Sequence, residues 1–204
     1  MKKRMNRTLG MIGIVTAVAL SFIGCAKVHM GETELTQKLV GISVDIRTFD
    51  EESNVIDKVT GKSVSIVRDS KFDSSSESKD SSVLKITVGK SEMSHVGSSL
   101  IMAEEGLYDI FDEYMKTVDI ENSDRSIPVI NRVVNGVLND TVGKEKTILI
   151  RSQSGKPLAT YVGNSVSSFS VDIPNTTAFL VDGKMLIVYR CDFTTYDTAL
   201  LLEK

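Results

Sequence analysis

Nucleophilic catalysis needs a thiol or hydroxyl beside an oriented base, and few residues of this chain could supply such a pair. The sequence has two cysteines and two histidines. Cys191 lies at the end of an apolar segment, and a cysteine in such a place is usually an unreactive buried residue. His95 precedes Ser98 and Ser99, but a catalytic serine also needs a positioned base and an oxyanion hole. We therefore expect His95 to make local hydrogen bonds at a turn or strand end, and the protein not to be an enzyme.

Motifs for cofactors and metals are missing from the sequence as well. Gly-Lys-Ser occurs at Gly61 and Gly89, yet Ile56 and Leu84 stand where a phosphate-binding loop has its first glycine. No pair of Cys or His residues has the spacing of metal ligands, and no calcium-loop pattern is present. The sequence therefore predicts no cofactor and no metal.

Amide side chains form the one unusual polar pattern. Asn131, Asn135 and Asn139 recur at four-residue intervals, with Arg132 beside the first of them. Asparagine is a poor helix former, so three in one row on a helix reduce its stability. Such a stripe can hydrogen-bond a glycan or a peptide, and a solvent-facing helix surface is the alternative. These four residues are the candidate contact surface.

The amino terminus combines a basic start, an apolar run and a cysteine. The run from Leu9 to Ile23 is too short for a membrane-spanning helix, which needs about 20 residues, but it suits a secretory signal peptide. Phe22-Ile23-Gly24-Cys25 resembles the lipobox of bacterial lipoproteins, with phenylalanine in place of the usual leucine. The resemblance implies that the Cys25 thiol is alkylated by diacylglycerol. Plain secretion and a retained anchor helix are the alternatives.

The expected lipid anchor divides the chain into three parts. Residues 1–24 are the signal peptide, residues 25–37 are the lipidated Cys25 with a polar tether, and residues 38–204 are the extracytoplasmic domain. Two acyl chains anchor a protein stably, so we expect the domain at the outer face of the bacterial cell membrane. With Cys25 modified, Cys191 has no partner for an intramolecular disulfide.

The charge of the chain excludes nucleic acid as a partner. Residues 1–24 contain four basic residues and no acidic one, so the rest of the chain carries 20 basic and 27 acidic residues. A domain this acidic repels phosphate backbones. Its composition, 41% hydrophobic and 25% charged, is that of an ordinary folded protein.

Alternating apolar residues predict several strands. The alternation runs from Leu39 to Phe49 and recurs over 63–67, 83–88, 98–103, 147–151, 158–162, 165–171, 178–181 and 184–190. Asp182-Gly183 is a two-residue hairpin signal between the last two strands. Both of these strands are apolar on both faces, which indicates a central position. Residues 68–82 contain seven serines and are expected to form a flexible loop or an insertion between strands.

Two stretches have helical periodicity instead. Apolar residues recur at helical spacing over 107–118 and over 127–141, where Ser126 can cap and Gly143 can end the helix. Each stretch has a single apolar face, which suits packing on one side of a sheet. We therefore predict an α+β fold with a mostly antiparallel β-sheet and two amphipathic helices packed on it.

The second half of the chain resembles a known family. The similarity is carried by HVGSSLI (95–101), NRVVNGVLND (131–140), RSQSGKPLATYVG (151–163) and PNTTAFLVDGKMLIVYRCDF (174–193). These segments are similar to a family of uncharacterised lipoproteins from Gram-positive bacteria, classified as a domain of unknown function. This chain has Asn175 and Tyr189 where the family pattern has lysine and histidine. The resemblance implies a lipoprotein and supplies no activity, cofactor or site residue.

These observations predict a membrane-anchored lipoprotein that binds or scaffolds another molecule at the cell envelope. Its expected partners are the membrane, through the lipid, and an envelope protein or a glycan. A lipoprotein that binds a small ligand or a glycan is the second hypothesis, and an envelope hydrolase is the third. A cavity in the structure would favour ligand binding, whereas a flat apolar patch would favour a protein partner.

Overall fold

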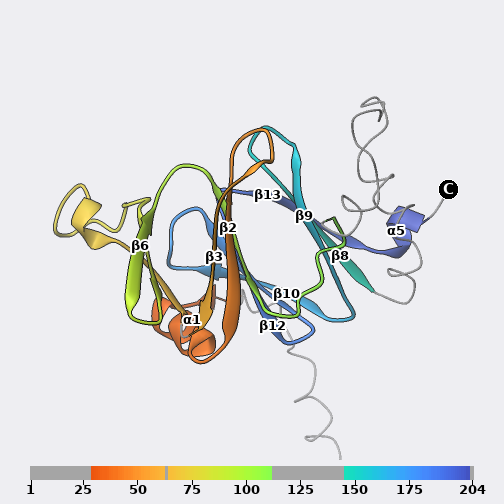
Figure 1. Cartoon of the computed structure of the whole chain (residues 1–204), viewed down its shortest axis with the longest axis horizontal. Helices are drawn as coiled ribbons and strands as arrows, with labels where there is room; N and C mark the ends of the chain where they lie inside the picture. Colours follow the sequence, from red (N-terminus) through yellow and green to blue (C-terminus); the bar gives the residue numbers. More distant parts are fainter. Residues whose placement is uncertain (1–28, 63, 112–144, 203–204) are drawn as a thin grey trace, which may run out of the picture.

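The computed structural model describes residues 29–62, 64–111 and 145–202, and strands dominate in them (Figure 1). In chain order the elements are β1 (His29–Met30), α1 (Glu32–Leu39), β2 (Ser43–Phe49), β3 (Val55–Lys62), β4 (Val64–Arg68), the 3-10 helix η1 (Ser70–Phe72), β5 (Leu84–Val88), β6 (Ser91–His95), β7 (Ser99–Glu104), β8 (Lys146–Arg151), β9 (Pro157–Gly163), β10 (Val166–Val171), β11 (Thr176–Val181), β12 (Lys184–Tyr189), β13 (Asp192–Asp197) and α5 (Ala199–Leu202).

The strands form three sheets. The central sheet has seven strands in the order β1-β10-β11-β12-β7-β2-β3, and two three-stranded sheets have the orders β4-β5-β6 and β13-β8-β9. All paired strands are antiparallel except β1 and β10. In Figure 1, β6 and α1 lie to the left of β2 and β3, and β8 and β9 lie to the right. The central sheet is therefore covered on both faces.

Both faces of the central sheet are apolar because its inner strands contribute to two separate cores. On β12, Met185, Ile187 and Tyr189 belong to the core that the central sheet shares with α1 and the β4-β5-β6 sheet. Leu186 and Val188 belong to the core shared with β8 and β9. This alternation confirms the central position predicted for the strands over 178–181 and 184–190.

The predicted hairpin between β11 and β12 is confirmed. Asp182 and Gly183 have φ angles of 50° and 83°, the left-handed pair that a type I′ turn requires. Val181 lies opposite Lys184 in the register of the two strands. The Asp182 carboxylate also accepts a hydrogen bond from the Asn164 backbone N–H at 2.8 Å, so the turn holds the chain that enters β10.

The fold class predicted from the sequence is wrong. The structure is mostly β; in the described ranges the α-helices are α1 and the single turn α5, and Ile110 and Phe111 are helical as well. The stretches predicted as amphipathic helices, 107–118 and 127–141, lie mainly or wholly outside the described residues. The helix that packs on the sheet is α1, which sequence periodicity misses because Leu35 and Leu39 are its only buried residues.

The folded domain begins inside the segment expected to be a polar tether. β1 pairs in parallel with β10, and α1 follows it directly. Leu35 and Leu39 are fully buried and belong to the core on the α1 side of the central sheet. Residues 29–37 are therefore part of the domain. The rest of the expected tether, 25–28, lies outside the described residues.

Of the two forms predicted for the serine-rich segment 68–82, the structure shows the insertion between strands: it connects β4 to β5 and contains η1. The Asp80 carboxylate accepts hydrogen bonds from the Ser74 backbone N–H at 3.0 Å and from the Ser78 hydroxyl at 2.7 Å. These hydrogen bonds lower the pKa of Asp80 below its ordinary value. The Tyr189 hydroxyl donates to the Ser82 carbonyl at 2.7 Å and fastens the segment to the core.

Candidate functional site

The residues predicted for lipidation and for contact with a partner lie outside the described residues. Cys25 precedes β1, and Asn131, Arg132, Asn135 and Asn139 fall within 112–144. Both hypotheses therefore stay predictions. Of the helices in the described part of the chain, none is long and apolar enough to cross a membrane.

The structure does not bring His95 and Cys191 together as a nucleophile and its base. His95 Nε2 donates to the Ser98 carbonyl at 2.9 Å, and its ring lies edge-on to Tyr189 with the centroids 5.6 Å apart. The local role predicted for His95 is thus confirmed. The Cys191 thiol points at the Leu100 and Tyr189 carbonyls, and burial raises its pKa to about 12. Such a thiol is a poor nucleophile at neutral pH.

A cleft of about 630 Å³ lies beside the central sheet, where β2 begins and β3 and β7 end. β2 pairs with β3 on one side and with β7 on the other, so three strand ends meet at this place. The residues that follow β7 and the Tyr161 ring on β9 complete the wall. The polar side chains of the lining are Ser43, Asp45, Arg47, Thr60, Lys62, Glu104, Glu105, Tyr108, Asp109 and Tyr161.

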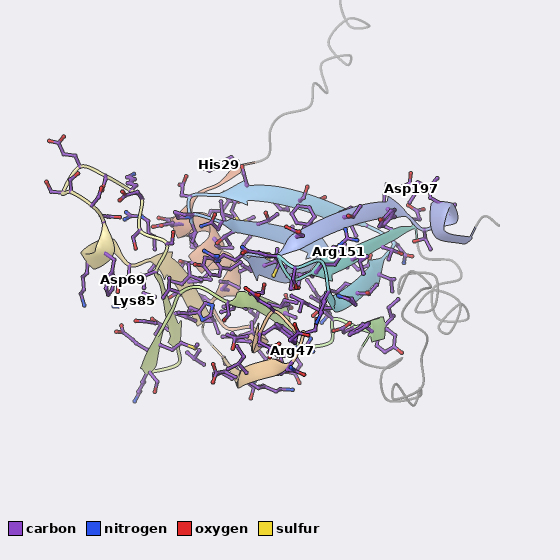
Figure 2. All side chains as sticks on the ribbon, turned by 90° about the horizontal axis from the view of Figure 1, so that it is seen from above. His29, Arg47, Asp69, Lys85, Arg151 and Asp197 are labelled. Atoms are coloured by element: carbon purple, nitrogen blue, oxygen red, sulfur yellow. The ribbon has the colours of Figure 1, made fainter. Side chains whose placement is uncertain are left out.

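A buried arginine on β2, Arg47, is among the residues that line the cleft, and Figure 2 labels it. Arg47 is only 8% exposed. Its Nη2 donates to Asp109 Oδ2 at 3.1 Å and to the Tyr161 hydroxyl at 3.2 Å. Asp109 Oδ1 in turn accepts the backbone N–H groups of Thr160 at 2.9 Å and Phe111 at 3.1 Å. The ion pair therefore ties β2 to β9 and to the segment after β7.

Asp45 is a carboxylate of the cleft with one oxygen that accepts no hydrogen bond. It lies two residues before Arg47 and so on the same face of β2. Asp45 Oδ2 pairs with Lys58 Nζ at 2.9 Å, whereas Oδ1 is 3.8 Å from Arg47 Nε. Oδ1 is buried and accepts no hydrogen bond. A buried acceptor without a donor costs free energy, which a donor on a bound ligand would recover.

The rim of the cleft is acidic. Glu104 and Glu105 stand there with Asp45, and Lys62 is the single lysine of the lining. Just outside the lining, Lys58 pairs with Asp45 and Lys184 Nζ donates to the Glu105 carbonyl at 2.6 Å. The buried Arg47 adds little positive charge because an aspartate already neutralises it. The excess of carboxylates favours a ligand that brings hydrogen-bond donors or positive charge, and it disfavours an anion.

Sequence patterns alone did not identify this site. Asp45 and Arg47 occupy alternate positions of a strand whose other positions are apolar, which is typical of a solvent-facing side. A second sheet buries that side in the structure. The sequence did contain one sign that this face is buried. Phe49, a large apolar residue, follows Asp45 and Arg47 on the same face of the strand, and it belongs to the core against β8 and β9.

Comparisons with known proteins identify a family whose function is unknown. The family model that matches residues 7–201 is described as a domain of unknown function, DUF5052. No curated protein and no solved structure matches the chain. The predicted resemblance to a domain family of unknown function is confirmed, whereas the lipoprotein and Gram-positive assignments stay predictions. Since the match spans nearly the whole sequence, the chain belongs to the DUF5052 family.

Proposed function

We propose that this protein is a lipid-anchored domain of the bacterial cell envelope that binds a small polar ligand. The anchor is supported by the basic start, the apolar run and Cys25 at its end. The binding role is supported by the cleft over Arg47. The observation that carries it is the buried Asp45 Oδ1, which accepts no hydrogen bond in a cleft built around a buried ion pair.

The lining of the cleft indicates the class of ligand. Asp45, Glu104 and Glu105 offer acceptors for hydroxyl and ammonium groups. Tyr108 is 44% exposed at the rim and offers an aromatic surface with a polar tip. Acceptors beside an aromatic ring suit a sugar, and the excess of carboxylates suits an amino sugar. The cleft therefore favours the ligand-binding hypothesis over that of a scaffold.

Three matched sugars test the class of ligand. Glucosamine, glucose and glucuronic acid share one ring framework and differ in charge. We expect glucosamine to bind most tightly and glucuronate most weakly, because the rim of the cleft is acidic. Saturable shifts of the Gly106 and Tyr108 amide NMR signals measure binding. Equal affinity for the three sugars, or no saturable shift with any of them, would contradict the proposal.

Substitution of Asp45 tests the site. Asp45→Asn keeps the shape of the side chain and removes its charge, so we expect glucosamine to bind at least about tenfold more weakly. Asp197→Asn is the matched control, because Asp197 also pairs with a lysine on a neighbouring strand but lies far from Arg47, next to α5 (Figure 2). Equal losses in the two variants would count against the cleft.

The anchor has its own test, which is independent of ligand binding. In bacterial cells supplied with a labelled fatty acid, the wild-type protein is expected to take up the label and to sediment with membranes. Cys25→Ser should abolish both, whereas Cys191→Ser should abolish neither because that thiol is buried. A labelled Cys25→Ser variant would rule out this attachment point.

A further inference from the structure

Arg190 occupies an unusual backbone position at the opposite end of β2 and β7 from the cleft. It lies between β12 and β13 with a φ angle of 50°, in the left-handed region that residues other than glycine rarely adopt. Asn175 faces it with a φ angle of 57° and accepts its backbone N–H at 2.9 Å. Ser99 Oγ donates to the Arg190 carbonyl at 2.8 Å. Both backbone polar groups are therefore fixed, and strained positions held in this way are frequent at binding sites.

Several connections between strands converge on this arginine. The β2–β3 turn, the residues before β7, the β8–β9 turn and Arg190 itself line a cavity of about 430 Å³. Arg190 and Gln153 also line a neighbouring cavity of about 600 Å³ beside the β10–β11 connection. The Ser154 hydroxyl donates to the Glu51 carbonyl at 2.8 Å, which joins two of the connections. Binding sites commonly form where loops gather at one end of a sheet.

The guanidinium group of Arg190 has donors to spare. An arginine carries five N–H donors, and here Nη2 donates to Gln153 Oε1 at 3.2 Å. Nε is buried and has no acceptor. Arg47 and Arg68 each have a carboxylate within 4 Å, whereas Arg190 forms no ion pair with any residue that the structure describes. An unpaired cation is notable in a domain with an excess of acidic residues.

The acidic residues near Arg190 form no ion pair with it in the part of the chain that the structure describes, and two of them, Asp50 and Glu51, line the same cavity. Asp50 uses both carboxylate oxygens within its own turn, where Oδ1 accepts two backbone N–H groups and Oδ2 accepts an amide N–H. Asp172 pairs with His29 at 2.9 Å. Asp192 lies directly opposite Arg151 in the register of β13 and β8. Glu51 is exposed to solvent. Arg190 therefore has no direct ion pair among the described residues, although the Asp50 and Glu51 carboxylates share the lining of the cavity with it.

We infer that Arg190 binds an oxyanion, the carboxylate or phosphate group of a small ligand, in the cavity of about 430 Å³. The planar guanidinium matches either group with two parallel N–H donors. Ser98 supplies a further hydroxyl group to the lining, and Ile56 adds an apolar wall for the body of the ligand. This cavity lies at the other end of β2 and β7 from the acidic cleft and shares no lining residue with it, so the second site is independent of the proposed sugar site.

Titration of the full-length protein with phosphate and with acetate, at constant ionic strength set by sodium chloride, tests the inference. The probe is the NMR signal of the Arg190 Nε–H group. We expect a saturable shift, and the anion with the tighter midpoint identifies the source of the oxyanion as phosphate or carboxylate. Shifts that do not saturate with either anion, or that chloride reproduces, would overturn the inference.

Two substitutions of Arg190 show whether the response depends on its side chain, and they differ in their effect on the backbone. Arg190→Gln should abolish the saturable response, read from the Ser98 and Gln153 amides, and Arg190→Gly should do the same while it relieves the left-handed backbone. Arg151→Gln is the matched control and should keep the response, because Arg151 does not line the cavity. A response that persists in both Arg190 variants would place the anion elsewhere.

Discussion

Arg47 and Asp109 keep their charges in a place where water is almost excluded. Their side chains are 9% and 7% exposed, so each has lost most of its hydration. Removal of a charge from water costs several kcal/mol, and an ion pair recovers that cost only when its geometry is good and its remaining groups are hydrogen-bonded. The two backbone N–H groups on Asp109 and the Tyr161 hydroxyl on Arg47 meet that condition.

Loss of one member of this pair should therefore be more harmful than loss of both. We expect Asp109→Ala to lower the free energy of unfolding by about 3–5 kcal/mol, because Arg47 is left buried without its carboxylate. Arg47→Met should have a similar cost. The double variant Arg47→Met/Asp109→Ala should cost clearly less than the sum of the two. Urea unfolding in a double-mutant cycle measures the difference, and strictly additive costs would show that the two charges do not interact.

The Cys191 thiol should be unreactive in the folded protein. Burial raises its pKa to about 12, so the thiol is neutral at pH 8. Relative to an ordinary cysteine, the thiolate fraction is lowered by about a thousandfold. In a Cys25→Ser variant, where Cys191 is the only cysteine, Ellman's reagent should react slowly with the native protein and rapidly in urea. Fast reaction without urea would mean that the thiol is accessible.

At the scale of elements, β3 and β4 form the passage from the central sheet into the β4-β5-β6 sheet. β3 ends at Lys62 and β4 begins at Val64, so the chain changes sheets within about one residue. Gly61 lets the end of β3 lie close to β5, because a side chain at this position would overlap Val88 Cγ1 on β5. The Gly89 N–H donates to the Lys62 carbonyl at 3.1 Å and closes the junction.

Gly61→Ala should accordingly strain the junction between the two sheets. A methyl group forced into a filled space typically costs about 1–3 kcal/mol of folding free energy. Val88→Ala removes Val88 Cγ1, the atom that the new methyl group would overlap. The double variant Gly61→Ala/Val88→Ala should therefore be more stable than the sum of the single costs predicts. Thermal unfolding of the four proteins provides the comparison. If Val88→Ala brings no relief, the strain lies elsewhere.

Local sequence patterns predicted most of the strands, but not β1, β6 and β13, and they predicted the partition into sheets poorly. Period-two alternation and Asp182-Gly183 act within a few residues, which is why β11, β12 and their turn could be predicted. Which sheet covers which face depends on contacts between distant segments. The sequence therefore did not reveal that β8 and β9 bury the Asp45 and Arg47 face of β2. α1 was missed because tertiary packing, not a strong apolar stripe, stabilises it.

For the whole molecule, the position of α1 links the domain to its proposed anchor. Three residues separate Cys25 from β1. His29 on β1 hydrogen-bonds Ser170 at 3.1 Å and pairs with Asp172 at 2.9 Å. An acylated Cys25 would therefore hold the domain close to the membrane surface. The folded structure would begin almost at the lipid, with α1 as its first helix.

The stability of the domain should consequently depend on residues close to the anchor. Leu35 is fully buried between the central sheet and the β4-β5-β6 sheet, so Leu35→Ala should lower the free energy of unfolding by about 2–5 kcal/mol. Val40→Ala is the control, because Val40 is 65% exposed and should change stability by less than about 0.5 kcal/mol. Urea unfolding of both variants provides the measurement. Equal, small effects would show that α1 is dispensable and that the independently folding domain begins after residue 40.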